Sequence, residues 1–348
     1  MLALVVNTAL ALVPVLLFLT ALQVMDSFQL VRPRSVFLAI SAGAAAALVC
    51  LALYDPLGGV TGVSAWNFSR YIAPAIEEIA KSAFVAFIIA RRRVGFLVDA
   101  AVIGFAVGAG FGLVENIHYL YWGTSDAPML LWLIRGLGTA MLHGATSCIF
   151  AMISKPMADR AAGHLATAFA PGLLTAIVIH SAFNHVLLPP LAMTLLLVAV
   201  LPALILVVFQ RSEAATRDWI GAGLDLDIEL LELVTSEHFT CTRLGQYLQE
   251  LKERFAGPVV ADMFCLLRVE LELSVQARAM VMAREAGVAV PIDDDLHACL
   301  AELEHLHASI GRTGMLALKP LQLTGHRDRW HKYLMTEAAR DASSAADR

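Results

Sequence analysis

Long apolar runs fill the first 210 residues of this chain and limit what it can fold into. Seven runs of about 20 apolar residues recur there, and each has the length that a helix needs to cross a bilayer. Hydrophobic residues make up 58% of the chain, which is more than a soluble globular protein carries. We therefore expect an all-α, polytopic membrane helix bundle of about seven transmembrane helices. The runs cover roughly residues 4–24, 35–54, 71–90, 96–122, 129–153, 163–187 and 191–210.

The composition changes after Gln210. Residues 1–210 carry a net charge of +2, whereas residues 211–348 carry −7 and repeat apolar residues at helical spacing with charges between them. We expect a transmembrane domain over 1–210, a soluble helical domain over 211–340 and a disordered, small and polar tail over 341–348. The acidic second part argues against nucleic acid as a partner.

The positive charges of the predicted loops indicate an orientation. Nine lie on one side of the predicted spans, whereas the other side has only Arg70. Cytoplasmic loops are rich in Lys and Arg, so we expect the N-terminus outside and the domain after residue 211 in the cytoplasm. The nine are Arg32, Arg34, Arg91, Arg92, Arg93, Lys155, Arg160, Arg211 and Arg217.

The third apolar run carries charges that a bilayer does not tolerate singly. Glu77 and Glu78 lie in its middle, and Lys81 follows four residues after Glu77. A carboxylate in the hydrocarbon region costs from roughly 2.5 to more than 10 kcal/mol, so it is retained only where it is paired or functional. Helical spacing places Lys81 on the same face as both glutamates, where it can neutralise one. Two adjacent carboxylates suit general acid or base chemistry.

Other ionisable residues are predicted at a similar depth. Glu77 lies about six residues, or roughly 9 Å, below the outer end of its span, and Glu115 and His180 lie at comparable depths in theirs. Asn184 follows His180 by one helical turn. His143 is predicted nearer the midplane. The convergence of carboxylates and imidazoles at one depth predicts a site near the outer leaflet.

Four short motifs in this region resemble those of the PrsW intramembrane proteases, relatives of the CAAX-prenyl proteases and bacteriocin-processing enzymes. The resemblance covers roughly residues 70–190 and does not extend to the chain after 211. The CAAX group has EExxxR and FxxxH, so Lys81 and Glu115 favour the PrsW branch. The motifs are Glu77-Glu78-x-x-Lys81, Phe111-x-x-x-Glu115 followed by Asn116 and Tyr119, His143, and His180-x-x-x-Asn184.

The resemblance implies peptide-bond hydrolysis within or at the edge of the membrane. Glu77 with Glu78 would activate the attacking water, and Glu115 with His143 would hold that water or a metal ion. Donors to a developing oxyanion stabilise acyl transfer strongly, and His180 and Asn184 would take that role. The supporting residues would be Lys81, Asn116 and Tyr119.

The resemblance leaves the cofactor open. The family is classed with metalloproteases, and Glu115, His143 and His180 would be plausible zinc ligands. The chain has no HExxH motif, and a metal-free glutamate mechanism is the alternative. The implied substrate is a membrane-anchored protein, such as an anti-sigma factor, cleaved on the outer side of a bacterial inner membrane.

Two other function classes fit some of these residues. Intramembrane Glu, His and Lys also build proton relays, so a proton-coupled transporter or receptor is one alternative. A non-catalytic scaffold whose tail recruits a cytoplasmic partner is the other.

Several nearby residues have plain structural explanations. His118 would be solvated at the interface, and Arg135 would pair with Asp126 or a headgroup. The set Gly104, Gly108 and Gly112 predicts close helix packing.

Overall fold

The computed structural model describes residues 2–26, 31–122, 128–161, 165–286, 288, 294–321 and 334–336. These residues form helices and no strands, so the all-α prediction is confirmed for them. The chain divides into two compact units, Met1–Glu213 and Ala214–Arg348. The predicted disordered tail, residues 341–348, and the predicted Arg135 partner Asp126 lie outside the described residues.

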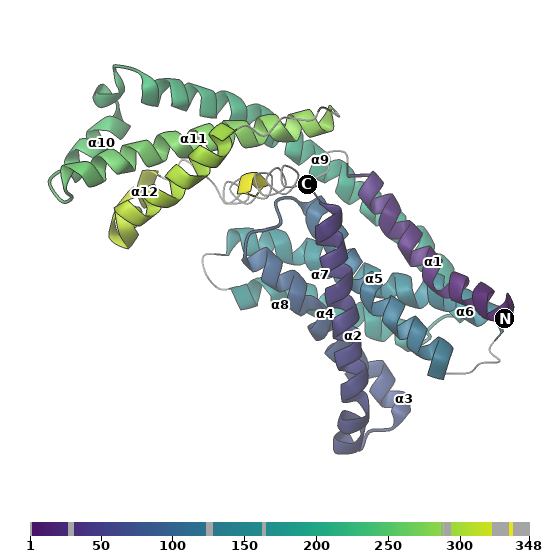
Figure 1. The fold of residues 1–348 in the computed structure, drawn as a ribbon. Helices are drawn as coiled ribbons and strands as arrows, with labels where there is room; N and C mark the ends of the chain where they lie inside the picture. Colours follow the sequence, from purple (N-terminus) through teal and green to yellow (C-terminus); the bar gives the residue numbers. More distant parts are fainter. Residues whose placement is uncertain are drawn as a thin grey trace. The chain divides into compact units, whose positions relative to one another are not determined.

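The first unit is a bundle of long helices (Figure 1). Two short π-helical segments, η1 and η2, run directly into α4 and α7. The elements are α1 (Leu2–Val24), α2 (Pro33–Thr61), α3 (Ala65–Asn67), η1 (Phe68–Ile72), α4 (Ala73–Ala90), α5 (Leu97–Trp122), α6 (Met129–Ile134), η2 (Arg135–Thr139), α7 (Ala140–Arg160), α8 (Leu165–Asn184) and the part of α9 (Pro190–Thr235) up to Glu213.

Six helices among the described residues are long and apolar enough to cross a membrane. They are α1, α2, α5, the continuous stretch Met129–Arg160, α8 and α9. The polytopic bundle is thus confirmed. The remaining predicted span, the third at 71–90, corresponds to α4, which holds three charged residues within 18 and is not among the six. The count of seven stays a prediction.

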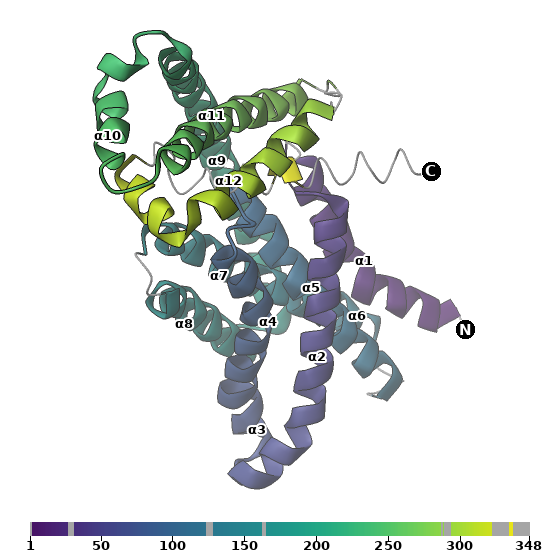
Figure 2. The same cartoon turned by 60° about the vertical axis from the view of Figure 1, so that its left-hand side comes forward.

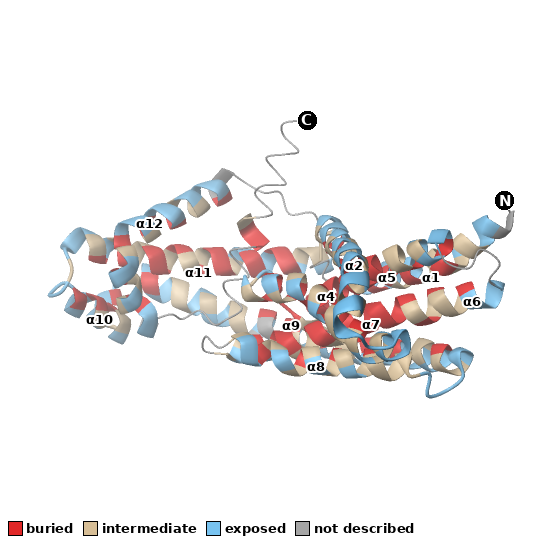
Figure 3. Ribbon diagram, turned by 90° about the horizontal axis from the view of Figure 1, so that it is seen from below, coloured by how far each residue is buried: buried red, intermediate tan, exposed pale blue. Residues whose placement is uncertain are grey.

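Helix α5 forms the centre of the first unit. It packs against α7, α2, α1 and α4, and most of its residues are buried (Figure 3). Its sequence is apolar on every side, which is what a helix surrounded by other helices requires. The elements that carry the polar residues of interest are therefore arranged around α5.

Glycines let the neighbouring helices touch α5 at the backbone. A Cβ atom on Gly108 would lie 1.9 Å from the carbonyl oxygen of His143 in α7, and one on Gly104 would lie 2.5 Å from that of Ser147. On the α2 side, a Cβ on Gly110 would lie 2.0 Å from the carbonyl oxygen of Ile40. These contacts confirm the close packing predicted from the glycine spacing.

The second unit is helical in its described residues. Helix α11 packs against α10 and α12, and its buried Arg278 binds Asp227 and donates to the carbonyl of Gly223 at 2.8 Å. Whether this unit is a separate soluble domain stays a prediction. Its elements are the part of α9 from Ala214 onward, η3 (Phe239–Cys241), α10 (Arg243–Leu251), α11 (Gly257–Glu285), α12 (Asp294–Leu318) and η4 (Lys319–Leu321).

We expect Gly110→Ala to destabilise the bundle by about 1–3 kcal/mol, because the added methyl group overlaps the backbone of α2. Gly59→Ala is the matched control, since a Cβ on that α2 glycine meets nothing within 4 Å. Thermal unfolding of both variants in detergent checks this. Equal melting temperatures for the two variants would contradict the close contact between α2 and α5.

Candidate active site

Helix α4 carries its charged side chains into the bundle. Glu77 is 6% exposed, and Glu78 and Lys81 are fully buried. They are buried because α4 packs against α2, α5, α7 and α8. Pro74 lies in the first turn of α4, directly after the π-helical η1.

One oxygen of Glu78 ties three helices together. Its Oε1 lies 2.6 Å from Lys81 Nζ, accepts a hydrogen bond from Thr146 Oγ1 of α7 at 2.9 Å, and lies 2.7 Å from His180 Nδ1 of α8. The pairing of Lys81 with a glutamate is as the sequence predicted. Since Nδ1 of His180 faces this carboxylate, the ring presents Nε2 on its other side.

His143 is held in a similar way from the opposite side. Its Nε2 lies 2.7 Å from Glu115 Oε2, and the other oxygen of Glu115 pairs with Arg135 Nη2 at 3.3 Å. The inner nitrogen, Nδ1, lies 3.1 Å from Lys81 Nζ. Each histidine thus has one ring nitrogen occupied by a carboxylate and the other turned inward.

Glu77 lies between the two inward nitrogens. The hydroxyl of Tyr54 donates to its Oε1. Its Oε2 is buried and has no hydrogen-bond partner among the described residues. This oxygen lies 3.6 Å from His180 Nε2 and 3.9 Å from His143 Nδ1.

The three residues Glu77, His143 and His180 have the chemistry of a metal site. One ligand atom from each lies within 4.8 Å of the others. Two imidazoles and a carboxylate, with one position left open, are typical of catalytic zinc. Ligating histidines usually bind a carboxylate through the second nitrogen, as both do here. The residues present therefore fit a divalent metal ion.

Of the other predicted site residues, Glu115 contacts this group directly, and Asn116, Tyr119 and Asn184 make contacts of their own. Glu115, expected beside the histidines, binds the outer nitrogen of His143. Buried Asn116 donates to the Ala11 carbonyl at 2.8 Å, and the Arg135 guanidinium lies 3.9 Å from the centre of the Tyr119 ring. Asn184 donates to the Ser69 carbonyl at 2.9 Å.

Three contributing residues were not predicted. Tyr54 and Thr146 are uncharged, so no electrostatic cost marks them within an apolar run. Arg135 was expected to pair with Asp126 or a headgroup, but it contacts Glu115 and donates to Asn116 Oδ1 at 3.0 Å. It is the first residue of the π-helical η2, and such segments are frequent at functional sites.

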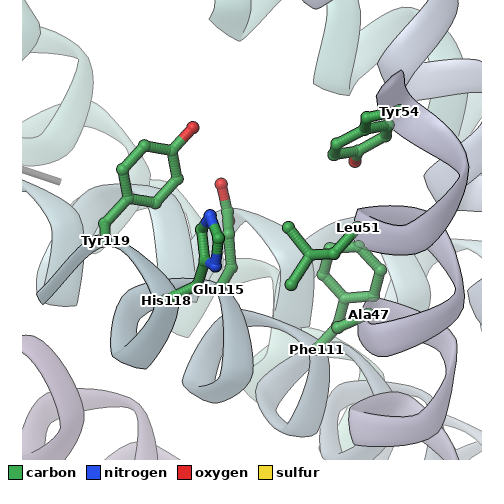
Figure 4. Close-up of a pocket in the computed structure, with 7 residues that line it drawn as sticks. All are labelled: Ala47, Leu51, Tyr54, Phe111, Glu115, His118 and Tyr119. Atoms are coloured by element: carbon green, nitrogen blue, oxygen red, sulfur yellow. The ribbon is translucent and has the colours of Figure 1, made fainter. Parts of the chain in front are cut away.

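A small pocket of about 110 Å³ adjoins the group (Figure 4). It lies between α2 and α5, and two of its lining residues, Tyr54 and Glu115, contact Glu77 and His143. His118, expected to be solvated, also lines it. The lining residues are Ala47, Leu51, Tyr54, Phe111, Glu115, His118 and Tyr119.

Comparison with known proteins identifies the first unit. A family model described as PrsW family intramembrane metalloprotease matches residues 31–209, which is more than half of the chain. The comparisons with curated proteins and with solved structures gave no match. The match and the apolar helices make the chain an integral membrane peptidase that acts on a membrane protein. The chain belongs to the PrsW family of intramembrane metalloproteases.

Proposed function

We propose that the chain hydrolyses a peptide bond of a membrane-anchored protein at the group formed by Glu77, His143 and His180. One observation carries the proposal. Glu77 Oε2, a buried carboxylate oxygen with no donor in the described part of the chain, faces the inner nitrogens of two histidines, and a carboxylate contacts the other nitrogen of each. A buried acceptor is costly unless a donor or a cation satisfies it, so the arrangement suits a bound ion.

We assign Glu77, His143 and His180 as the ligands of a zinc ion. Glu77 takes the place that the sequence hypothesis gave to Glu115, because its oxygen faces both inner nitrogens. When bound, the ion supplies Lewis-acid polarisation of the peptide carbonyl. For His143 to serve as a ligand, Lys81 gives up its contact with Nδ1 and keeps those with Glu78 and Thr146.

Glu115 is the proton acceptor that we assign for the attacking water. Its side chain is 19% exposed and lines the pocket, whereas the side chain of Glu78 is fully buried. Each carboxylate has about four acceptor positions, so Glu115 can bind a water proton while it contacts His143 and Arg135. Glu78 and Tyr54 then orient His180 and Glu77.

The oxyanion role of Asn184 remains part of the proposal. Its amide donates to the Ser69 carbonyl and would have to leave it to reach a substrate bound beside His180, which lies one helical turn before Asn184. His180 contacts Glu78 through Nδ1 and would bind the ion through Nε2, so it would donate to the oxyanion only in the metal-free mechanism.

We expect Glu77→Gln and His180→Ala to lose bound metal. Their activity should fall by more than roughly 100-fold, which is the loss that substitution of a residue behind a metal ligand causes. Glu115→Gln should retain metal and lose about 10²–10⁴-fold in rate, as removal of a general base does. Metal analysis of the purified protein and cleavage of single-span substrates measure the two effects separately.

The exposed glutamate Glu229 of α9 provides the control, and Glu229→Gln should keep both metal and activity. Full activity after complete chelation would contradict the zinc assignment. It would instead favour the metal-free mechanism, in which Glu77 Oε2 takes the proton. Cleavage that survives all three substitutions would refute the site itself.

We further propose a bacterial inner-membrane protein with its N-terminus outside and residues 211–340 as a soluble cytoplasmic domain. The loop charges support this orientation. The substrate proposed from the family likeness is a membrane-anchored anti-sigma factor cleaved on the outer side. Family membership favours this function over a transporter or a scaffold, for which the described residues offer no separate support.

Cys241, an exposed thiol in the second unit, tests the orientation. In spheroplasts, a membrane-impermeant maleimide should label Cys241 only after permeabilisation, and Cys241→Ser should remove that signal. Ser64→Cys, at an exposed position between α2 and α3, should be labelled without permeabilisation. The opposite pattern would show the reverse orientation.

A further inference from the structure

The pocket between α2 and α5 shares two walls with the proposed reaction site. Tyr54 lines the pocket and donates to Glu77, and Glu115 lines it and contacts His143. Figure 4 shows Tyr54 on one helix and Glu115 on the facing helix. A group bound in this pocket is therefore separated from the proposed ligands Glu77 and His143 by a single side chain, that of Tyr54 or Glu115.

The shape of the pocket follows from how the two helices cross. Gly43 and Gly110 allow backbone contact, because a Cβ on Gly43 would lie 1.8 Å from the carbonyl oxygen of Val107. Beyond this point the C-terminal halves of α2 and α5 diverge in both Figures 1 and 2. The pocket lining comes from those halves.

The pocket lining combines apolar and polar side chains. Ala47, Leu51 and Phe111 supply an apolar wall, whereas Tyr54 and Glu115 supply polar atoms next to the reaction site. The charge of Glu115 is already balanced by Arg135 at 3.3 Å, so the pocket does not demand a basic occupant. The volume of about 110 Å³ is well below the roughly 300–1,000 Å³ of sites for drug-sized ligands. It suits one side chain of a few carbon atoms.

We propose that this pocket is the subsite for the side chain of a substrate residue next to the scissile bond, and that it selects a small aliphatic side chain. The inference rests on the proposed peptidase site. The occupant is part of the membrane-protein substrate. The apolar residues of the pocket would hold its aliphatic side chain, and Tyr54 and Glu115 would keep its peptide bond near Glu77.

Leu51 is the residue that sets the size limit. It is partly buried on α2 and lines the pocket, and its aliphatic side chain has no polar atom with which to bind Glu77, His143 or His180. Leu48, on the same helix, is 61% exposed and does not line the pocket. The two leucines therefore form a matched pair, of which only one faces the proposed occupant.

The test uses the purified full chain and a panel of single-span substrates that carry Ala, Leu or Phe at each residue beside the scissile bond. At one of these positions, Leu51→Ala should raise cleavage of the Phe substrate relative to the Ala substrate about tenfold, and Leu51→Phe should lower cleavage of the Leu substrate by a similar factor. Leu48→Ala should leave the relative rates as in the unaltered chain.

Unchanged relative rates in both Leu51 variants, with the unaltered enzyme active, would overturn the subsite and leave the proposed function standing. An equal change in Leu48→Ala would also overturn it, because the effect would then come from α2 as a whole. If the unaltered chain cleaves no member of the panel while holding its metal, the proposed function fails and the subsite fails with it.

Discussion

The burial of the Glu78–Lys81 pair is the constraint on which the rest of the first unit depends. Both side chains are fully buried, and removal of one partner from such a pair leaves an uncompensated charge that costs about 3–5 kcal/mol. The charge of Glu78 is shared with Thr146 and His180, so α4, α7 and α8 are joined at one oxygen. A helix too polar to count as a membrane span by composition is thereby held inside the bundle.

The sequence was sufficient to predict which titratable residues converge, because charge inside an apolar run is conspicuous. Depth predicted that Glu77, Glu115 and His180 lie close together, and the family resemblance added Glu78 and His143. The structure brings Glu77, His143 and His180 together. It was not sufficient to rank Glu77 above Glu115 as the carboxylate between the histidines. Both lie at similar predicted depths on different helices, and the sequence does not specify how each helix is rotated about its axis.

The contacts that uncharged residues make with the site could not be predicted from the sequence, for a different reason. Tyr54 reaches Glu77 because α2 packs against α4, and periodicity in the sequence does not specify which helices pack together. Arg135 was noticed in the sequence but given another partner. The family match begins at residue 31, yet the Ala11 carbonyl of α1 binds Asn116, which in turn binds Arg135. Helix α1 therefore contributes to the environment of Glu115 from outside the matched region.

The contact between Gly108 and the His143 carbonyl has a consequence for how this enzyme can diverge. The backbone of α7 contacts α5 at His143, a proposed metal ligand, so the absence of a side chain on Gly108 sets how close this imidazole lies to α5. A methyl group there would displace the imidazole as well as the helix. A substitution at Gly108 is therefore expected to change stability and activity together, because both depend on the distance between the two backbones.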